Sequence, residues 1–303
     1  MVWIITALAA AVISSVGNVF DSFLVSKKMP SLTSFLIPMG VAQIAVACIL
    51  LAIFPFPHNV DTMHILGTIG GSLINAGSFL ILLNSLRKGE VSRAIPVIST
   101  SPIFIALLSI PLLSATLGYW QWLAVIMTVA GAVLISLQFG HSGGKTRLHK
   151  SFFALLLAAL MGAIGSIGFK YGLEQISFWN VFGISGICIG TLVLAYSLRK
   201  KNLLELKNLT QRTQKISLVT IDQLVGITSA IVAFKAMGLG QVSLVNAILN
   251  IRPVFVFIFS LILSRFFPNI VNEPLQRKTA LIKFAAIGIM TAGIVIISLS
   301  TAK

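Results

Sequence analysis

Charged residues and cysteines are scarce in this chain. Of its 303 residues, 10% are charged, 7 are acidic and 2 are cysteines. A soluble domain carries about 25% charged residues and about 45–50% apolar residues, whereas 57% of this chain is apolar and its mean hydropathy is +1.00. These values exclude a soluble fold and a disordered chain. The two cysteines, Cys48 and Cys188, each lie inside an apolar run, which excludes a disulfide scaffold.

Long apolar runs are what the sequence has instead. A helix needs roughly 20 apolar residues to cross a bilayer, and the chain has ten such runs, so we predict an all-α integral membrane protein with ten transmembrane helices. The first run is too long for a signal peptide and lacks a basic leader, so we expect it to remain as a helix. The longest loop, near 198–216, is polar and basic. The runs cover residues 3–25, 32–54, 64–86, 92–113, 119–138, 151–173, 177–197, 217–237, 242–264 and 280–299.

The two halves of the chain resemble each other. Adding 151 to the numbers of the first half aligns Gly89, Val91, Ser92, Pro102, Phe104 and Ser109 with identical residues at 240, 242, 243, 253, 255 and 260. The sequence Ala-Gly-x-Val-x-Ile-Ser-Leu occurs at 130–137 and again at 292–299, and the larger offset fits a longer ninth loop around 267–277. We therefore predict a first five-helix repeat at 1–140, a linker at 141–150 and a second repeat at 151–303.

An odd number of helices in each repeat has a topological consequence. The second repeat must enter the membrane from the opposite side, so the two repeats are inverted relative to each other. Inverted repeats are the architecture of alternating-access transporters, whose sites lie near the membrane midplane between the repeats. A duplication that only builds a stable bundle is the alternative.

The net charge of +15 is a topology signal and no sign of nucleic-acid binding. Eighteen of the 22 basic residues lie in or beside the loops after helices 1, 3, 5, 7 and 9, all on one side of the membrane. The positive-inside rule places this side in the cytoplasm and both termini outside. The eighteen are Lys27, Lys28, Arg87, Lys88, Arg93, Lys145, Arg147, Lys150, Arg199, Lys200, Lys201, Lys207, Arg212, Lys215, Arg265, Arg277, Lys278 and Lys283.

Arg252 is the most informative residue at membrane depth. An ionisable group there costs about 2.5–3.5 kcal/mol or more, and such groups often face a cavity and mark function. Pro253 follows it and frees backbone groups one turn earlier, while Asn246 and Asn250 share a helix face. We expect Arg252 to bind an anionic substrate group and the two asparagines to position it. A structural ion pair of Arg252 with a buried acid is the alternative.

Other polar residues in the apolar runs form a second group of candidates. Asp21 and Asn18, one turn apart in helix 1, are expected to couple transport to an ion, because a carboxyl group shielded from water can bind a proton in the working range. Asp222 is expected to open helix 8, where it is interfacial. The remaining candidates for substrate binding are Asn75, Lys170 and Lys235, although Lys170 and Lys235 could instead extend to the membrane interface, and Asn75 could form a packing hydrogen bond.

Glycines four residues apart occur in three of the runs. Such spacing allows two helices to approach closely, so we interpret these glycines as packing positions. The pairs are Gly67 with Gly71, Gly168 with Gly172, and Gly186 with Gly190.

Enzymatic and cofactor chemistry finds little support in the sequence. The Gly183–Gly186 segment resembles the GxSG motif of rhomboid proteases, but the four histidines fall in loops or at helix ends, away from a serine at membrane depth. No paired His, Cys or carboxylate spacing predicts a metal site, and no phosphate-binding loop predicts ATP hydrolysis. We expect no catalytic residue, no metal and no cofactor.

These repeats resemble the drug/metabolite transporter superfamily, in its ten-helix EamA-like branch. The resemblance lies in the two five-helix halves, in Gly-x-Val-Ser at 89–92 and 240–243, in Pro-x-Phe at 102–104 and 253–255, and in the shared fifth-helix ending. It implies an exporter or exchanger in a bacterial cytoplasmic (inner) membrane. Members of this family generally keep both termini in the cytoplasm, which differs from the charge distribution here, and they do not ordinarily have arginine before the Pro-x-Phe.

Taken together, the sequence predicts a secondary active transporter that moves a small, anionic or amino-acid-like metabolite by alternating access. Its expected partners are this substrate and membrane lipids, without nucleic acid, and we expect a monomer or homodimer. The alternatives are a flippase for a lipid-linked substrate, a multidrug exporter, and a membrane scaffold without transport activity.

Overall fold

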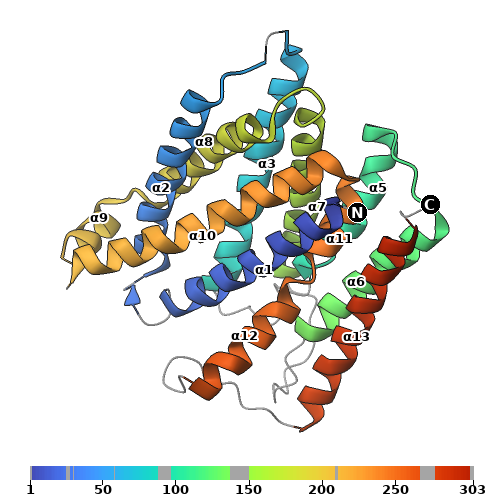
Figure 1. Cartoon of the computed structure of the whole chain (residues 1–303). Coiled ribbons are helices and arrows are strands. Elements are labelled where there is room, and N and C mark those ends of the chain that lie inside the picture. Colours follow the sequence, from blue (N-terminus) through green and yellow to red (C-terminus); the bar gives the residue numbers. More distant parts are fainter. Residues whose placement is uncertain are drawn as a thin grey trace.

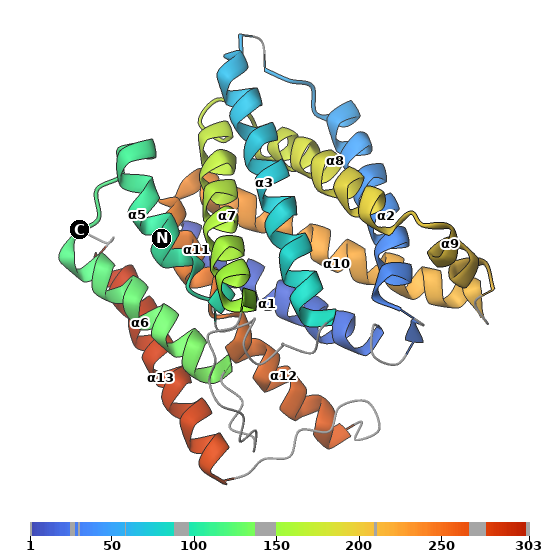
Figure 2. The same cartoon turned by 180° about the vertical axis from the view of Figure 1, so that it is seen from behind.

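The computed structural model describes residues 2–24, 28–29, 31–57, 59–87, 97–136, 150–208, 211–266 and 277–300, and all regular secondary structure in these ranges is helical (Figures 1 and 2). The predicted linker up to residue 149, Arg93, the Gly-x-Val-Ser motif at 89–92 and the ninth loop at 267–276 lie outside the described residues. The helices are α1 (Val2–Phe23), α2 (Leu32–Ile53), α3 (Thr62–Arg87), α5 (Ser101–Leu113), α6 (Tyr119–Ser136), α7 (Lys150–Gly172), α8 (Phe178–Ser197), α9 (Lys200–Lys207), α10 (Arg212–Leu239), α11 (Val242–Leu249), α12 (Arg252–Phe266) and α13 (Arg277–Ser300).

The helices confirm an all-α membrane protein of about ten spans. Eight apolar segments in the described ranges are long enough to cross a membrane, and one of these runs through α11 into α12. Two shorter apolar helices, Ser101–Leu113 and Tyr119–Ile135, supply the fourth and fifth spans of the first half. Serine caps begin two of the spans: the Ser31 hydroxyl accepts from the Ser34 amide of α2, and the Ser177 hydroxyl from the Asn180 amide of α8.

Two of the predicted segments differ from the structure. The segment near 198–216 contains the short helix α9, which is tied to the start of α2 because the Ser31 and Ser34 hydroxyls donate to Glu205 Oε2 at 2.8 and 2.9 Å. The ninth span is not one continuous helix over 242–264 but is broken between α11 and α12. Arg252 therefore begins α12 and does not lie within an unbroken helix.

The break in the ninth span follows from Pro253. Proline has no amide hydrogen and clashes with the carbonyl one turn earlier, and it disfavours helical geometry in the preceding residue. The backbone turns tightly at the break, where the Ile251 amide bonds to Ile248 and the Val254 amide to Ile251, at 3.1 and 2.9 Å. The same two bonds, shifted by 151 residues, join Thr100 to Val97 and Ile103 to Thr100 before Pro102, at 3.1 and 3.0 Å. The duplication is thus visible in the hydrogen bonds of the backbone.

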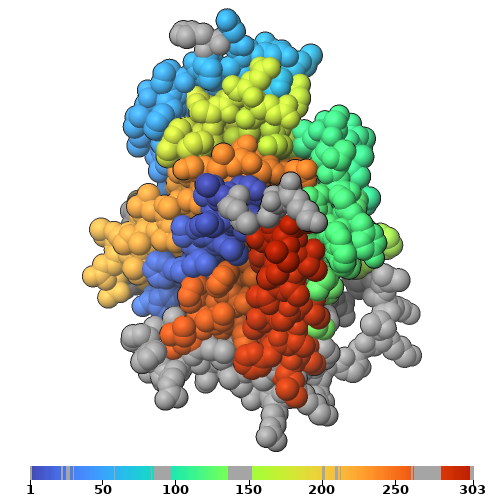
Figure 3. All heavy atoms as spheres, turned by 45° about the vertical axis from the view of Figure 1, so that its right-hand side comes forward, coloured from blue at the N-terminus to red at the C-terminus, as the bar shows by residue number. Residues whose placement is uncertain are grey.

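Helix contacts between the two halves are reciprocal. In the first half α1 packs against α10 and α12, and its equivalent in the second half, α7, packs against α3 and α5. The pairs α2 with α8 and α6 with α13 join equivalent helices of the two halves. Figure 3 shows α1, in blue, bordered by orange segments of the second half. Contacts of this kind are what a two-fold axis between inverted repeats produces.

The two halves approach each other closely where α3 crosses α7. A Cβ atom added at Gly71 would lie 2.9 Å from Gly168 Cα, and one at Gly168 would lie 2.8 Å from the Gly67 carbonyl oxygen. Side chains or backbone of a neighbouring helix also meet the Cβ positions of Gly172, at Thr68, and of Gly190, at Ile44. These contacts confirm that the spaced glycines are packing positions.

Candidate functional site

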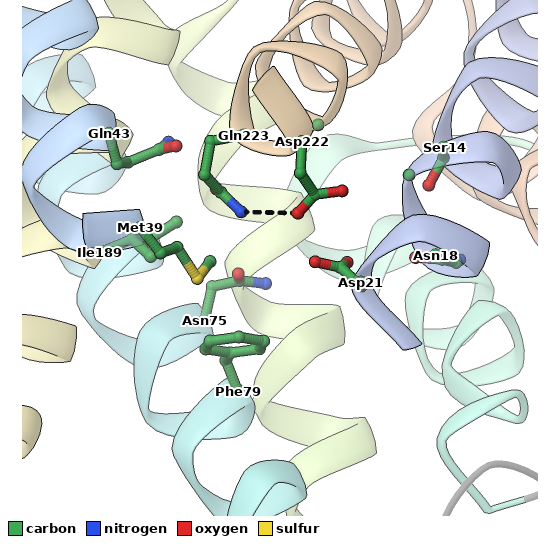
Figure 4. Close-up of a pocket in the computed structure, with 12 residues that line it drawn as sticks. Ser14, Asn18, Asp21, Met39, Gln43, Asn75, Phe79, Ile189, Asp222 and Gln223 are labelled. Carbon is green, nitrogen blue, oxygen red and sulfur yellow. Dashed lines mark hydrogen bonds between the residues drawn. The ribbon is translucent and has the colours of Figure 1, made fainter. Parts of the chain in front are cut away.

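A cavity of about 250 Å³ lies between the two halves (Figure 4). It is formed by α1, α2 and α3 of the first half and by α8 and α10 of the second. The α1 residues that face it recur with helical spacing, which places them on one face of that helix. The twelve lining residues are Ser14, Gly17, Asn18, Asp21, Met39, Gln43, Asn75, Phe79, Ile189, Asp222, Gln223 and Gly226.

Two carboxyl groups from opposite halves point into this cavity. Asp21 lies near the end of α1, Asp222 lies in the interior of α10, and Figure 4 shows the two side chains facing each other. Their helices pack against each other, and Gly17 of α1 faces Val225 of α10, where a Cβ would lie at an ordinary contact distance of 3.7 Å from Val225 Cγ1. Asp222 is only 2% exposed. Two ionised carboxylates at this position repel each other, and a bound proton or cation removes that repulsion.

The oxygens of Asp222 differ in their surroundings. Gln223 Nε2 donates a long hydrogen bond of 3.4 Å to Asp222 Oδ2. Asp222 Oδ1 is buried and has no hydrogen-bond partner among the described residues. A buried polar oxygen without a partner costs free energy.

The remaining polar groups of the cavity are neutral. They are the amides of Asn18, Gln43, Asn75 and Gln223 and the hydroxyl of Ser14. None of the twelve lining residues, all of them within the described ranges, is Lys, Arg or His. The formal charge of the cavity is therefore negative whenever either carboxyl group is ionised.

The helices α1, α3 and α8 end on one side of the molecule, where α2 and α10 begin. We call it the basic side because Lys28, Arg199 and Lys215 flank these helix ends. The cavity is displaced toward this side. Met39 lies seven residues after the start of α2, and Phe79 lies eight residues before the end of α3. At about 1.5 Å per residue these positions are roughly 10–12 Å from the helix ends. The cavity thus lies closer to the basic side than to the other.

Side-chain contacts join the two halves on the other side of the molecule. The His64 ring at the start of α3 stacks on Tyr171 near the end of α7, with centroids 4.1 Å apart, and His64 is 7% exposed. Its two ring nitrogens lie 3.8 Å from carboxylate oxygens of Asp61 and Glu174. We call these four residues the opposite-side contact. Nearby, Asn180 donates to the Phe54 carbonyl at 2.8 Å and also links the halves.

Three of the predicted site residues, Asp21, Asn18 and Asn75, meet in this cavity. Asp222 was expected at the start of helix 8. The corresponding helix α10 begins at Arg212, ten residues before Asp222, so that Asp222 lies in the interior of the helix. The basic residues before position 217 hid this start from a search for apolar runs. Gln43 and Gln223 were not anticipated, although an amide in the middle of the second apolar run is a signal that could have indicated Gln43.

The predicted lysines do not line this cavity. Lys170 Nζ donates to the Met237 carbonyl of α10 at 2.9 Å. Lys235 lines a second, apolar depression with Leu173, Phe178 and Gly238. Both side chains thus lie where α7 and α10 end, away from Asp21 and Asp222.

Arg252 and the two asparagines lie at the helix break. Asn250 Nδ2 donates to the Ser99 carbonyl at 2.8 Å and so joins the equivalent breaks of the two halves, while Asn246 Nδ2 bonds to Val242 of its own helix. The Arg252 carbonyl accepts from Ser15 at 3.1 Å. Arg252 Nε is buried, and within the described chain it has no hydrogen-bond partner and Arg252 forms no ion pair.

A metal site and the GxSG segment are the remaining possibilities considered from the sequence. No group of three or more His, Cys, Asp or Glu side chains that could hold a metal ion occurs in the part of the chain that the structure describes. Ser185 is 1% exposed and its hydroxyl donates to the Phe182 carbonyl of its own helix at 2.9 Å.

Comparison with known proteins gives a family match and matches to solved structures. The sequence profile of the EamA-like transporter family matches residues 1–137. A crystal structure of another protein superimposes on this chain with a TM-score of 0.69 at 17% identity, and 99% of each chain is covered. Such low identity shows a shared fold alone. No curated protein matches the chain significantly.

Proposed function

We propose that this multi-pass membrane protein is a secondary active transporter for a small metabolite. The premise is that residues 1–137 form an EamA-like transporter family domain of the drug/metabolite transporter superfamily. Members of this family are transporters rather than enzymes. The proposal includes alternating access as the mechanism and a bacterial cytoplasmic membrane as the location.

The observation that carries the proposal is the cavity between the halves. Carboxyl and amide groups from α1, α3 and α10 gather there inside a chain that is otherwise apolar. Ionisable groups at this depth are costly and mark substrate or ion pathways in membrane proteins. The position between two inverted repeats is where transporters of this architecture bind their substrates.

The contacts of the structure support an assignment of conformation. The cavity lies toward the basic side, whereas the opposite-side contact joins α3 to α7 beyond it. We propose that this structure is the state accessible from the basic side. Opening toward the other side then requires separation of His64 from Tyr171 and closure of α1 against α10 at the basic side.

Asp21 is our candidate for proton coupling, with Asn18 one turn away as a neutral hydrogen-bonding partner for the transported group. A carboxyl group that binds a proton in one state and a substrate in the other couples the two movements. The structure adds Asp222 to this pair, because its side chain faces Asp21 across the cavity (Figure 4).

The Asp21→Asn variant is expected to lose proton coupling. In proteoliposomes that contain a pH-sensitive dye, we would add a panel of amines, amino acids and carboxylates under an imposed pH gradient. The wild-type protein should show gradient-dependent flux of at least one compound, whereas in Asp21→Asn the flux should be the same with and without the gradient. Glu205→Gln, which removes a carboxylate outside the cavity and outside the opposite-side contact, is the control and should behave as wild type. Persistence of the pH dependence in Asp21→Asn would contradict this role, and absence of flux for every compound would contradict the proposed transport.

Loss of the opposite-side contact is expected to shift the protein toward the alternative state. An aromatic pair contributes about 0.5–1.5 kcal/mol beyond its burial, so Tyr171→Ala should raise the open population on that side by about two- to tenfold. The measurement is labelling of Thr68→Cys, a fully buried position, by a membrane-impermeant maleimide in a background that lacks Cys48 and Cys188. Tyr119→Ala, at an exposed position, should leave the labelling rate unchanged. Equal rates in the two variants would show that the contact does not close this side.

A further inference from the structure

We infer that the cavity binds a small organic cation that carries one or two protonated amino groups, held between Asp21 and Asp222. This inference rests on the proposed transport function and names the substrate class of the same site. The juxtaposition that carries it is a pair of carboxyl groups from opposite halves in a cavity without a basic side chain.

Charge is the first argument for an amine. Asp21 and Asp222 contribute up to two negative charges, and the other polar groups of the lining are neutral amides and a hydroxyl. A carboxylate ligand would add a third negative charge in a site where water screens it poorly. A protonated amine instead neutralises the carboxylate that it contacts and relieves the repulsion between the two. The cavity therefore selects for positive charge.

The unpartnered oxygen of Asp222 is the second, independent argument. Asp222 is 2% exposed. Its Oδ1 has no hydrogen-bond partner in the described part of the chain. Gln223 holds the other oxygen at 3.4 Å. Asp222 Oδ1 is thus a buried acceptor in a residue that lines the cavity, and an ammonium N–H donor would satisfy it.

The amide side chains and the volume define the rest of the ligand. Asn18, Gln43 and Asn75 offer carbonyl oxygens to further N–H or O–H groups and amide nitrogens to acceptors. A volume of about 250 Å³ equals roughly eight water molecules at about 30 Å³ each. This volume is sufficient for a small metabolite with a four-carbon chain and lies below the about 300–1,000 Å³ of pockets that bind drug-sized molecules.

Four compounds with the same four-carbon chain test this assignment directly. They are 1,4-diaminobutane, 4-amino-1-butanol, 1,4-butanediol and succinate, measured at equal ionic strength against detergent-purified protein. We expect the two amines to raise the thermal unfolding midpoint and the diol and succinate to leave it unchanged, since bound ligand stabilises by mass action. In Asp222→Asn the dissociation constant for the diamine should rise at least about tenfold, which corresponds to about 1.4 kcal/mol.

Matched variants separate binding from folding. Glu205→Gln, outside the cavity and the opposite-side contact, should bind the amines as the wild type does. Asp222→Glu should keep the preference for amines because it keeps the charge. Asp21→Asn is the second cavity variant should Asp222→Asn not purify as folded protein. Stabilisation by succinate or the diol equal to that by the amines would overturn the inference. So would undiminished amine binding in a folded Asp222→Asn or Asp21→Asn variant.

Failure of this inference is distinguishable from failure of the proposed function. Binding selective for succinate, together with gradient-dependent flux in proteoliposomes, would retain the transporter and reject the amine. Absence of flux for all members of the panel, even with amine binding intact, would reject the transporter.

Discussion

Gly71→Val is expected to destabilise the folded protein more than any single change in the cavity. A Cβ atom at this position would lie 2.9 Å from Gly168 Cα and 3.1 Å from the Gly165 carbonyl oxygen, and both contacts are with backbone. Backbone atoms cannot rotate aside as a flexible side chain can, so α3 and α7 must separate. Overpacking of this kind typically costs about 1–3 kcal/mol of folding free energy. Valine adds a branched side chain, so we expect a cost above the low end of this range.

The neighbouring glycine supplies the control for this prediction. Gly70 lies in the same helix, and a Cβ there would meet nothing within 4 Å. Gly70→Val therefore carries the same change in helix propensity without the clash. The thermal unfolding midpoint of the purified protein should fall strongly in Gly71→Val and little in Gly70→Val. Similar midpoints for the two variants would show that the α3–α7 crossing does not limit stability.

Arg252→Leu is expected to remove transport of a carboxylate-bearing substrate without loss of stability. Arg252 Nε is buried and unpartnered at the start of α12 within the described chain, and an uncompensated cation at membrane depth is costly. A structural ion pair would have stabilised the fold, but no acidic partner accompanies Arg252 in the described residues. We therefore expect the unfolding midpoint to stay constant or to rise.

The transport effect of Arg252→Leu should depend on the charge of the substrate. A hydrogen bond to a charged group contributes about 1.5–3 kcal/mol, so flux of 4-aminobutanoate should fall about tenfold or more. Flux of 4-amino-1-butanol, which has no carboxylate, should change little. A lower unfolding midpoint with unchanged flux of both compounds would reduce Arg252 to a structural residue. Loss of 4-aminobutanoate flux with retained 4-amino-1-butanol flux would, together with the amine site, define an amino-acid-like substrate with a charged group at each end.

The prediction of the spans from the sequence was accurate because each depends on local composition. An apolar run of about 20 residues has few alternatives to a membrane helix, and the ten runs reappear in the structure with shifted ends. The shifts occur where polar residues continue a helix, as at Arg212 in α10. The same locality explains the helix break, since Pro253 acts on the residues directly before it, but the sequence did not show that the helix stops there completely.

The cavity could be predicted only in part. Asn18, Asp21 and Asn75 were recognisable as polar groups within apolar runs, whereas Asp222 was assigned to a helix end that lies ten residues further upstream. The predicted boundaries of the two repeats remain a prediction. The family match covers residues 1–137 and does not test where one repeat ends and the next begins.

The sequence by itself determined the membrane class, the number of spans and the duplication, because hydropathy and internal similarity are properties of the chain alone. Tertiary structure decided which of the 7 acidic residues meet. Asp21 and Asp222 come together because α1 of the first half packs against α10 of the second. A pairing across 201 positions of sequence depends on how helices cross, and the pattern within either helix contains no record of its partner.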